Sequence, residues 1–135
     1  SVKDRINERV KFRESFRPFA PSVLHEAGAN HFENYQPSLY MERTLKFSQP
    51  QHAPGVVHCD GTGRLQSVTA DLNPRFHALI QAFAAKTGVP MLLNTSLNVM
   101  GQPIVHDVED ALALFFTTGL DVLVLNNHVF VKRPR

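Results

Sequence analysis

The sequence predicts one mixed α/β domain over residues 1–135, with a twisted mixed sheet and flanking helices. Short apolar runs suited to strands are interspersed with segments of helical spacing. The clearest helix lies over residues 74–87, between an Asn-Pro start and Gly88. The hydrophobic fraction of 43% and the charged fraction of 19% are typical of a globular chain. At this length the chain can bury a real core.

The amino-terminal part predicts a helix followed by a strand. Residues 4–14 are rich in charged helix formers, and the helix should end near Arg17 because Pro18 disfavours helical geometry in the residue before it. A strand is expected over residues 19–24, with Pro21 favouring an edge position. Three elements are then indicated: a short helix over residues 25–33, a strand over residues 39–47 and a loop over residues 49–54.

The middle of the chain predicts a β-hairpin. Residues 56–59 and 65–68 are strand-like and flank the glycine-bearing loop 60–64. The helix over residues 74–87 follows, capped by Asn73. Its apolar positions share one face: Phe76, Leu79, Ile80 and Phe83.

The carboxyl-terminal part predicts a strand, a helix and a second hairpin. The strand begins at Met91 and gives way to an irregular loop through residues 101–103. Asp107 caps a helix over residues 108–118, whose first turn is acidic as the helix dipole favours. Residues 122–125 and 129–131 then form the terminal hairpin.

Composition excludes several classes of function. A net charge of +2 argues against nucleic acid as a partner, because Lys and Arg are scattered outside residues 1–17 and the tail 132–135. No apolar stretch approaches membrane-spanning length, so no membrane partner is expected. Cys59 is the only cysteine, which excludes an internal disulfide and favours a cytoplasmic setting. The seven histidines lack metal-ligand spacing, so we expect no metal within this chain, and His77 is expected partly exposed rather than catalytic.

Two sets of side chains are candidates for a ligand site. Short uncharged polar residues follow the apolar strand at Met91, where α/β sheets usually hold ligands: Asn94, Thr95, Ser96 and Asn98. Four cations could supply positive charge from elsewhere in the chain: Lys11, Arg13, Arg17 and Arg64. Together they indicate a site for a phosphorylated or carboxylated small molecule.

Each set also has a purely structural interpretation. The cations near residues 11–17 fit a solvated helix face, residues 60–64 fit a polar turn, and residues 94–98 could satisfy their own backbone. A nucleophilic role for Ser96 is the weaker idea, because a GxSxG motif is absent. From the pattern alone these alternatives stay open.

Three blocks of sequence resemble the carboxy-terminal domain of O-carbamoyltransferases, the family of nodulation protein U and of the tobramycin and cephamycin carbamoyltransferases. The blocks are VKFRESFRPFAPSV at residues 10–23, HCDGTGRLQ at residues 58–66, and LLNTSLN with GQPIV at residues 92–105. The resemblance implies a YrdC-like domain that makes carbamoyl-adenylate from carbamoyl phosphate and ATP, the ATP carrying Mg²⁺.

The resemblance also implies a further domain. An actin-like ATPase-type amino-terminal domain would pass the carbamoyl group to a hydroxyl of a small molecule or sugar, and would carry the family metal, Fe or Zn. We expect this chain to be a fragment that lacks that domain and the segment before its first block. The hydroxyl acceptor and the oligomeric state stay open, a homodimer included.

Site roles follow from the same resemblance. It implies that Lys11 and Arg17 bind carbamoyl phosphate and that Ser96 is the phosphate-site serine, which makes these three the catalytic set. The nucleotide- and pocket-forming set consists of Arg13, Arg64, Asn94 and Asn98. The alternatives are a YrdC-type threonylcarbamoyl-adenylate synthase or RNA-binding module, and a non-catalytic interaction module.

Overall fold

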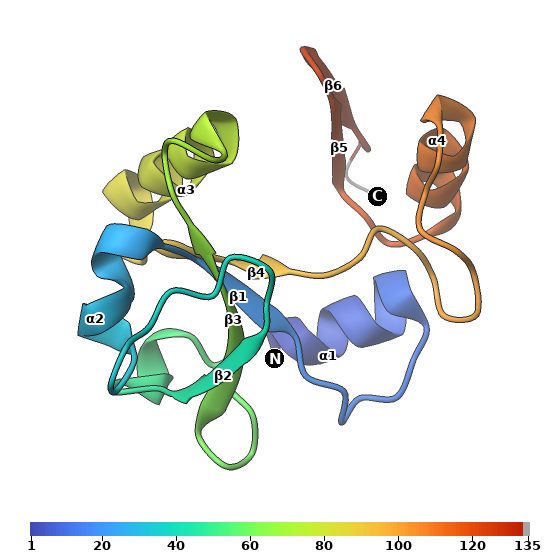
Figure 1. Cartoon of the computed structure of the whole chain (residues 1–135). Helices are drawn as coiled ribbons and strands as arrows, with labels where there is room; N and C mark the ends of the chain where they lie inside the picture. Colours follow the sequence, from blue (N-terminus) through green and yellow to red (C-terminus); the bar gives the residue numbers. More distant parts are fainter. Residues whose placement is uncertain (134–135) are drawn as a thin grey trace. The chain divides into compact units, whose positions relative to one another are not determined.

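The computed structural model describes residues 1–133, and the chain falls into two compact units. One unit is Pro18–Thr95, and the other joins Ser1–Arg17 to Ser96–Arg135. Helices and strands are mixed along the chain, which confirms the α/β class (Figure 1). Compact contacts do not define independently folding domains, so the single domain over residues 1–135 stays a prediction. No helix among residues 1–133 is both long and apolar enough to cross a bilayer.

The unit Pro18–Thr95 is built on a four-stranded sheet with the strand order β2-β3-β1-β4 (Figure 1). Strands β1 and β3 are parallel, and the other two pairs are antiparallel. The strands are β1 (Ala20–Leu24), β2 (Arg43–Lys46), β3 (Thr62–Val68) and β4 (Met91–Asn94). The sheet is therefore mixed, as predicted.

The edge position expected for β1 from Pro21 is wrong, because β1 lies between β3 and β4. The Leu24 N–H donates to Pro90 O at 3.1 Å, on the β4 side. Alternate residues face alternate sides of a strand, so the Pro21 nitrogen faces β3. The register with β3 begins only at Ser22, so the proline removes no hydrogen bond from that ladder.

The predicted hairpin between residues 56–59 and 65–68 is also wrong. Strand β3 starts at Thr62 and pairs with β2, so Gly63 and Arg64 lie in a strand rather than in a loop. Gly63 faces the buried Phe47 ring, which a Cβ at that position would overlap. Strand β2 is shorter than residues 39–47 because Met41 has φ 61°, which interrupts the extended chain.

Helices flank this sheet. Residues 25–33 form a 3₁₀ turn, His25–Ala27, and the short helix α2, Gly28–His31, as predicted. A second 3₁₀ turn, Pro50–His52, lies in the predicted loop. Helix α3 spans Pro74–Thr87 and confirms the predicted bounds.

Helix α3 has the expected ends but a narrower apolar face. Asn73 accepts a hydrogen bond from the Phe76 N–H at its start, and Gly88 ends it with φ 75°. Ile80 is buried with the core residues of β1 and β3, whereas Leu79 is 57% exposed. The partial exposure expected for His77 is wrong: its side chain is buried, and its Nε2 lies 2.8 Å from Glu26 Oε1.

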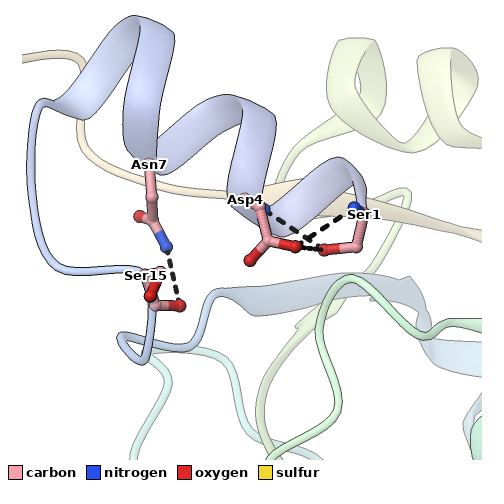
Figure 2. Close-up of polar contacts among 4 residues, drawn as sticks. All are labelled: Ser1, Asp4, Asn7 and Ser15. Atoms are coloured by element: carbon pink, nitrogen blue, oxygen red, sulfur yellow. Dashed lines mark hydrogen bonds and ion pairs between the residues drawn. The ribbon is translucent and has the colours of Figure 1, made fainter.

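The other unit begins with helix α1, Val2–Ile6, which continues as a π-helical segment over Asn7–Lys11. A capping box joins Ser1 and Asp4: the Ser1 hydroxyl accepts from the Asp4 N–H at 3.2 Å, and the Asp4 carboxylate accepts from the Ser1 amino group at 3.1 Å (Figure 2). Phe12 has φ 49°, so the helix ends at Lys11, earlier than the predicted end near Arg17.

The same unit contains the carboxyl-terminal elements. Helix α4 (Val108–Thr117) begins at the N-cap Asp107, whose carboxylate accepts from the Asp110 N–H, as predicted. The two-stranded sheet of β5 (Val122–Leu125) and β6 (His128–Val131) confirms the terminal hairpin. The buried residues of this core come from α4 and β5: Ala111, Phe115 and Leu123.

Candidate functional site

The Lys11 ammonium is the centre of the clearest polar network. Its side chain is buried, with 2% exposed. Nζ donates to Ser96 at the main-chain oxygen (2.7 Å) and at Oγ (3.2 Å). It also contacts Asn98 at the main-chain oxygen (2.7 Å) and at Oδ1 (2.6 Å), so four oxygens share its three N–H groups. The fold thus brings together three predicted site residues from two distant blocks of sequence.

Further hydrogen bonds fix the loop that Lys11 holds. Ser96 Oγ donates to Asn98 Oδ1 at 2.7 Å, and Asn98 Nδ2 donates to the Gln102 oxygen at 2.8 Å. The Met100 N–H donates to the Lys11 oxygen at 2.9 Å. Lys11 contacts the loop through both its side chain and its main chain, and it therefore helps to fix the geometry of the Ser96–Asn98 turn.

The charge of Lys11 has no acidic partner within ion-pair distance among residues 1–133. Burial lowers the pKa of its ammonium, and the charge of Arg13 lowers it further. Four dipolar oxygens can orient the ammonium but cannot cancel its net charge. A protonated Lys11 therefore makes this part of the unit attractive to an anion.

Asn7 holds the loop that carries the two predicted arginines. It is buried, with 1% exposed, and its Nδ2 donates to the Arg17 oxygen at 3.1 Å. The same Nδ2 lies 3.5 Å from the Ser15 oxygen (Figure 2). Its Oδ1 accepts from Arg13 Nε at 2.8 Å. Sequence reasoning missed Asn7; the available signal was a polar residue inside a helical segment, where asparagine is disfavoured without a partner.

The two arginines of this loop have different surroundings. Arg17 is exposed, and its Nε lies 2.9 Å from Glu14 Oε2. Such a solvated pair contributes little stability, so Arg17 can exchange this partner for another anion at small cost. Burial lowers the pKa of Arg13, and the charge of Arg17 adds to the effect.

Arg64 and Asn94 belong to the other unit, Pro18–Thr95. Arg64 is exposed on β3, and its side chain has no hydrogen-bond or ion-pair partner within the described part of the chain. Asn94 Nδ2 donates to Gln66 Oε1 at 2.9 Å, and Ser22 Oγ donates to the same oxygen at 2.8 Å. Asn94 is thus tied to β1 and β3 at the end of β4.

A cavity of about 420 Å³ opens beside Asn98 in the unit that contains Lys11. Its wall combines amide and apolar side chains, among them Phe12, Gln102 and Leu114, with the carboxyl group of Asp110. This volume falls within the range of small-molecule sites, roughly 300–1,000 Å³. The Lys11 network therefore has a hollow next to it in which a small ligand fits.

Comparison with known proteins identifies the family. Residues 1–132 match the sequence model of the family described as Carbamoyltransferase C-terminus. The chain is 42% identical to nodulation protein NolO of Bradyrhizobium diazoefficiens, covering 98% of this chain and 25% of the relative. It is 44% identical to nodulation protein NolNO of Sinorhizobium fredii, and the match covers 97% of this chain and 20% of the relative.

A third relative is named for its chemistry. The chain is 35% identical to the 3'-hydroxymethylcephem-O-carbamoyltransferase of Amycolatopsis lactamdurans, covering 93% of this chain and 24% of the relative. The chain belongs to the carboxy-terminal carbamoyltransferase family, which confirms the resemblance seen in the sequence. It spans about a quarter or less of the length of these curated relatives.

Proposed function

We propose that this chain is the part of an ATP-dependent O-carbamoyltransferase that binds carbamoyl phosphate and ATP and forms carbamoyl-adenylate. Membership of the carbamoyltransferase family supports carbamoyl transfer in general. The observation that carries the finer proposal is the Lys11 network, in which a buried cation without an acidic partner contacts Ser96 and Asn98. Positive charge beside directional hydrogen-bonding groups suits a small dianion that ends in an amide.

The reaction has two bond-making steps. Water cleaves carbamoyl phosphate to carbamate and phosphate, and a carbamate oxygen then attacks the α-phosphorus of ATP as pyrophosphate leaves. No covalent bond to the protein forms in either step. The protein's task is to hold two polyanions close together and to stabilise charge as it moves, which positioned cations and dipoles do well.

The proposed roles follow the surroundings of each side chain. Lys11 and Arg17 reduce the repulsion between the two anions, and Ser96 turns its hydroxyl hydrogen from Asn98 Oδ1 to a phosphate oxygen when the substrate binds. Arg13 and Arg64 bind phosphate oxygens of the substrates, and Asn94 and Asn98 help to orient the substrates through their amide groups. Mg²⁺ binds the triphosphate and neutralises part of its charge.

The remaining part of the reaction is assigned to the whole protein. A carbamoyl group activated as the adenylate passes to a hydroxyl, the kind of acceptor that the name of the cephem relative states. Among residues 1–133 no three His, Cys, Asp or Glu side chains come together as a metal site. The Fe or Zn of the family therefore finds no fitting donor set in these residues, and we assign it no step here.

Isothermal titration of the protein with carbamoyl phosphate tests this proposal. We expect saturable binding that Arg17→Ala and Ser96→Ala each weaken at least tenfold, since each removes an interaction with a charged group worth about 1.5–3 kcal/mol. Arg75→Ala, which removes an exposed cation from α3, is the matched control and should bind like the parent. Unchanged binding in both site variants would refute the assignment of the site. Release of pyrophosphate from ATP that requires threonine and bicarbonate, rather than carbamoyl phosphate, would support the threonylcarbamoyl-adenylate alternative.

A further inference from the structure

A second cavity, of about 310 Å³, lies within the unit Pro18–Thr95. Its polar wall consists of Thr44, His58 and Arg64, and its apolar wall of Pro18, Phe19 and Ala20. Thr44 and Arg64 are opposite each other in the antiparallel register of β2 and β3, so their side chains share one face of the sheet. The cavity is large enough for a small anion, and neither His58 nor Thr44 has a role in the site described above.

A chain of hydrogen bonds indicates which ring nitrogen of His58 carries the proton in the neutral imidazole. Thr62 Oγ1 donates to Asp60 Oδ1 at 2.7 Å, and the Thr62 N–H donates to the same oxygen at 3.0 Å. These bonds lower the pKa of Asp60, which therefore acts as a carboxylate acceptor. Thr62 Oγ1 also lies 3.1 Å from His58 Nδ1. The only hydroxyl proton of Thr62 is directed to Asp60, so Thr62 Oγ1 accepts, and His58 Nδ1 carries the proton.

The backbone holds this arrangement in place. The His58 N–H donates to the Thr62 oxygen at 2.7 Å, and the Gly61 N–H donates to the His58 oxygen at 3.0 Å. Gly61 has φ 81°, a conformation that favours glycine. The turn from His58 to Thr62 is thus closed by main-chain hydrogen bonds as well as by the hydrogen bonds between side chains. Together these bonds fix the orientation of the imidazole.

The consequence concerns the other ring nitrogen. With the proton on Nδ1, Nε2 of neutral His58 is a hydrogen-bond acceptor, and it has no hydrogen-bond partner within the described part of the chain. The guanidinium of Arg64, on the same cavity wall, can only donate. The cavity therefore offers an acceptor and a cationic donor together, a combination that fits a ligand with both an N–H group and an oxyanion.

We propose that this cavity recognises the carbamoyl end of the substrate, with His58 Nε2 accepting from the carbamoyl N–H and Arg64 donating to an anionic oxygen. The inference rests on the proposed function and adds a specificity-determining residue to it. His58 distinguishes carbamoyl phosphate from acyl phosphates that have a methyl group in place of the amide nitrogen. A binding site built around a hydrogen bond rejects the analogue that cannot form it.

Competing titrations with carbamoyl phosphate and acetyl phosphate test this assignment. We expect the parent protein to prefer carbamoyl phosphate roughly tenfold, the equivalent of one good hydrogen bond. His58→Phe should bring the ratio of the two affinities close to one, and His58→Gln, which keeps an acceptor, should retain most of the preference. Thr62→Val should reduce the preference in part, because it removes the hydroxyl that accepts from His58 Nδ1 and so no longer favours one tautomer of the ring.

The outcomes separate this inference from the function on which it rests. If the parent binds neither compound, the proposed function itself fails. If carbamoyl phosphate binds but the preference is unchanged in His58→Phe, the function stands and the role of His58 is overturned. Nitrogen-15 shifts of the parent His58 ring give a test that needs no variant: a protonated Nδ1 and an unprotonated Nε2 are expected, and the reverse pattern contradicts the inference.

Discussion

Replacing Asn7 by alanine should destabilise the protein far more than an ordinary surface substitution. Asn7 has 1% of its surface exposed and makes three side-chain contacts, to the Arg17 oxygen, the Ser15 oxygen and Arg13 Nε. The contact at 3.5 Å is long enough to count for little, whereas those at 3.1 and 2.8 Å are good hydrogen bonds. The neutral bond contributes about 1 kcal/mol and the bond from the guanidinium about 1.5–3 kcal/mol.

The expected loss for Asn7→Ala is therefore about 2.5–4 kcal/mol of the free energy of unfolding, a large part of the roughly 5–15 kcal/mol that a domain has. Urea denaturation measures it. Asn30→Ala is the matched control: Asn30 is exposed on α2, so its replacement should change the free energy by less than about 0.5 kcal/mol. A loss for Asn7→Ala no greater than that of the control would refute the idea that this side chain holds the 13–17 loop.

Two further predictions concern the sheet and the turn that precedes β3. Gly63→Ala should lower the free energy of unfolding, measured by urea denaturation, by about 1–3 kcal/mol, because the new Cβ overlaps the buried Phe47 ring. Ser48→Ala, at an exposed position, is the control and should leave the free energy of unfolding unchanged. Equal stabilities of the two variants would contradict this packing. The lowered pKa of Asp60 means that its stabilising contribution is present above pH 3.8 and is lost as the pH falls through the folded-state pKa. Thr62→Val should bring the Asp60 pKa back toward 3.8 in a carboxyl NMR titration, and an unchanged pKa would argue against the hydroxyl as its main cause.

Local features of the fold could be predicted from the sequence because they depend on neighbouring residues. The caps Asn73 and Asp107 and the terminator Gly88 have the predicted geometry, since each involves only the adjacent turn of helix. Strand pairing failed where the partner is distant: β3 pairs with β2, although residues 56–59 lie closer in sequence. Alternation of apolar and polar side chains indicates that a segment is extended, but it does not indicate which other strand the segment pairs with.

The residues of the candidate site also differ in whether the sequence alone could identify them. Lys11 and Ser96 could be named from three blocks of familiar sequence, and their joint network is consistent with a shared task. Asn7 and His58 could not, because their significance depends on burial and on the exact partner of each polar atom. An asparagine in a helix or a histidine before a turn is ordinary until the fold places the partners around it.

The helical segment at Asn7–Lys11 suggests that one element controls two parts of the site separately. Asn7 and Lys11 are four residues apart, the spacing that puts side chains on one helical face, and both are buried. Yet their bonds go to different segments: Asn7 to residues 13–17, and Lys11 to residues 96–98 and Met100.

Amide hydrogen exchange can distinguish these two tasks. The Arg17 N–H donates to the Glu14 oxygen within the loop that Asn7 holds, so Asn7→Ala should speed its exchange and leave the Asn98 amide protected. Lys11→Met should do the reverse, because the Asn98 amide donates to Ser96 in the turn that the ammonium fixes. Faster exchange of both amides in both variants would mean that the two loops open as one cooperative unit, and that Arg17 and Ser96 cannot be adjusted independently.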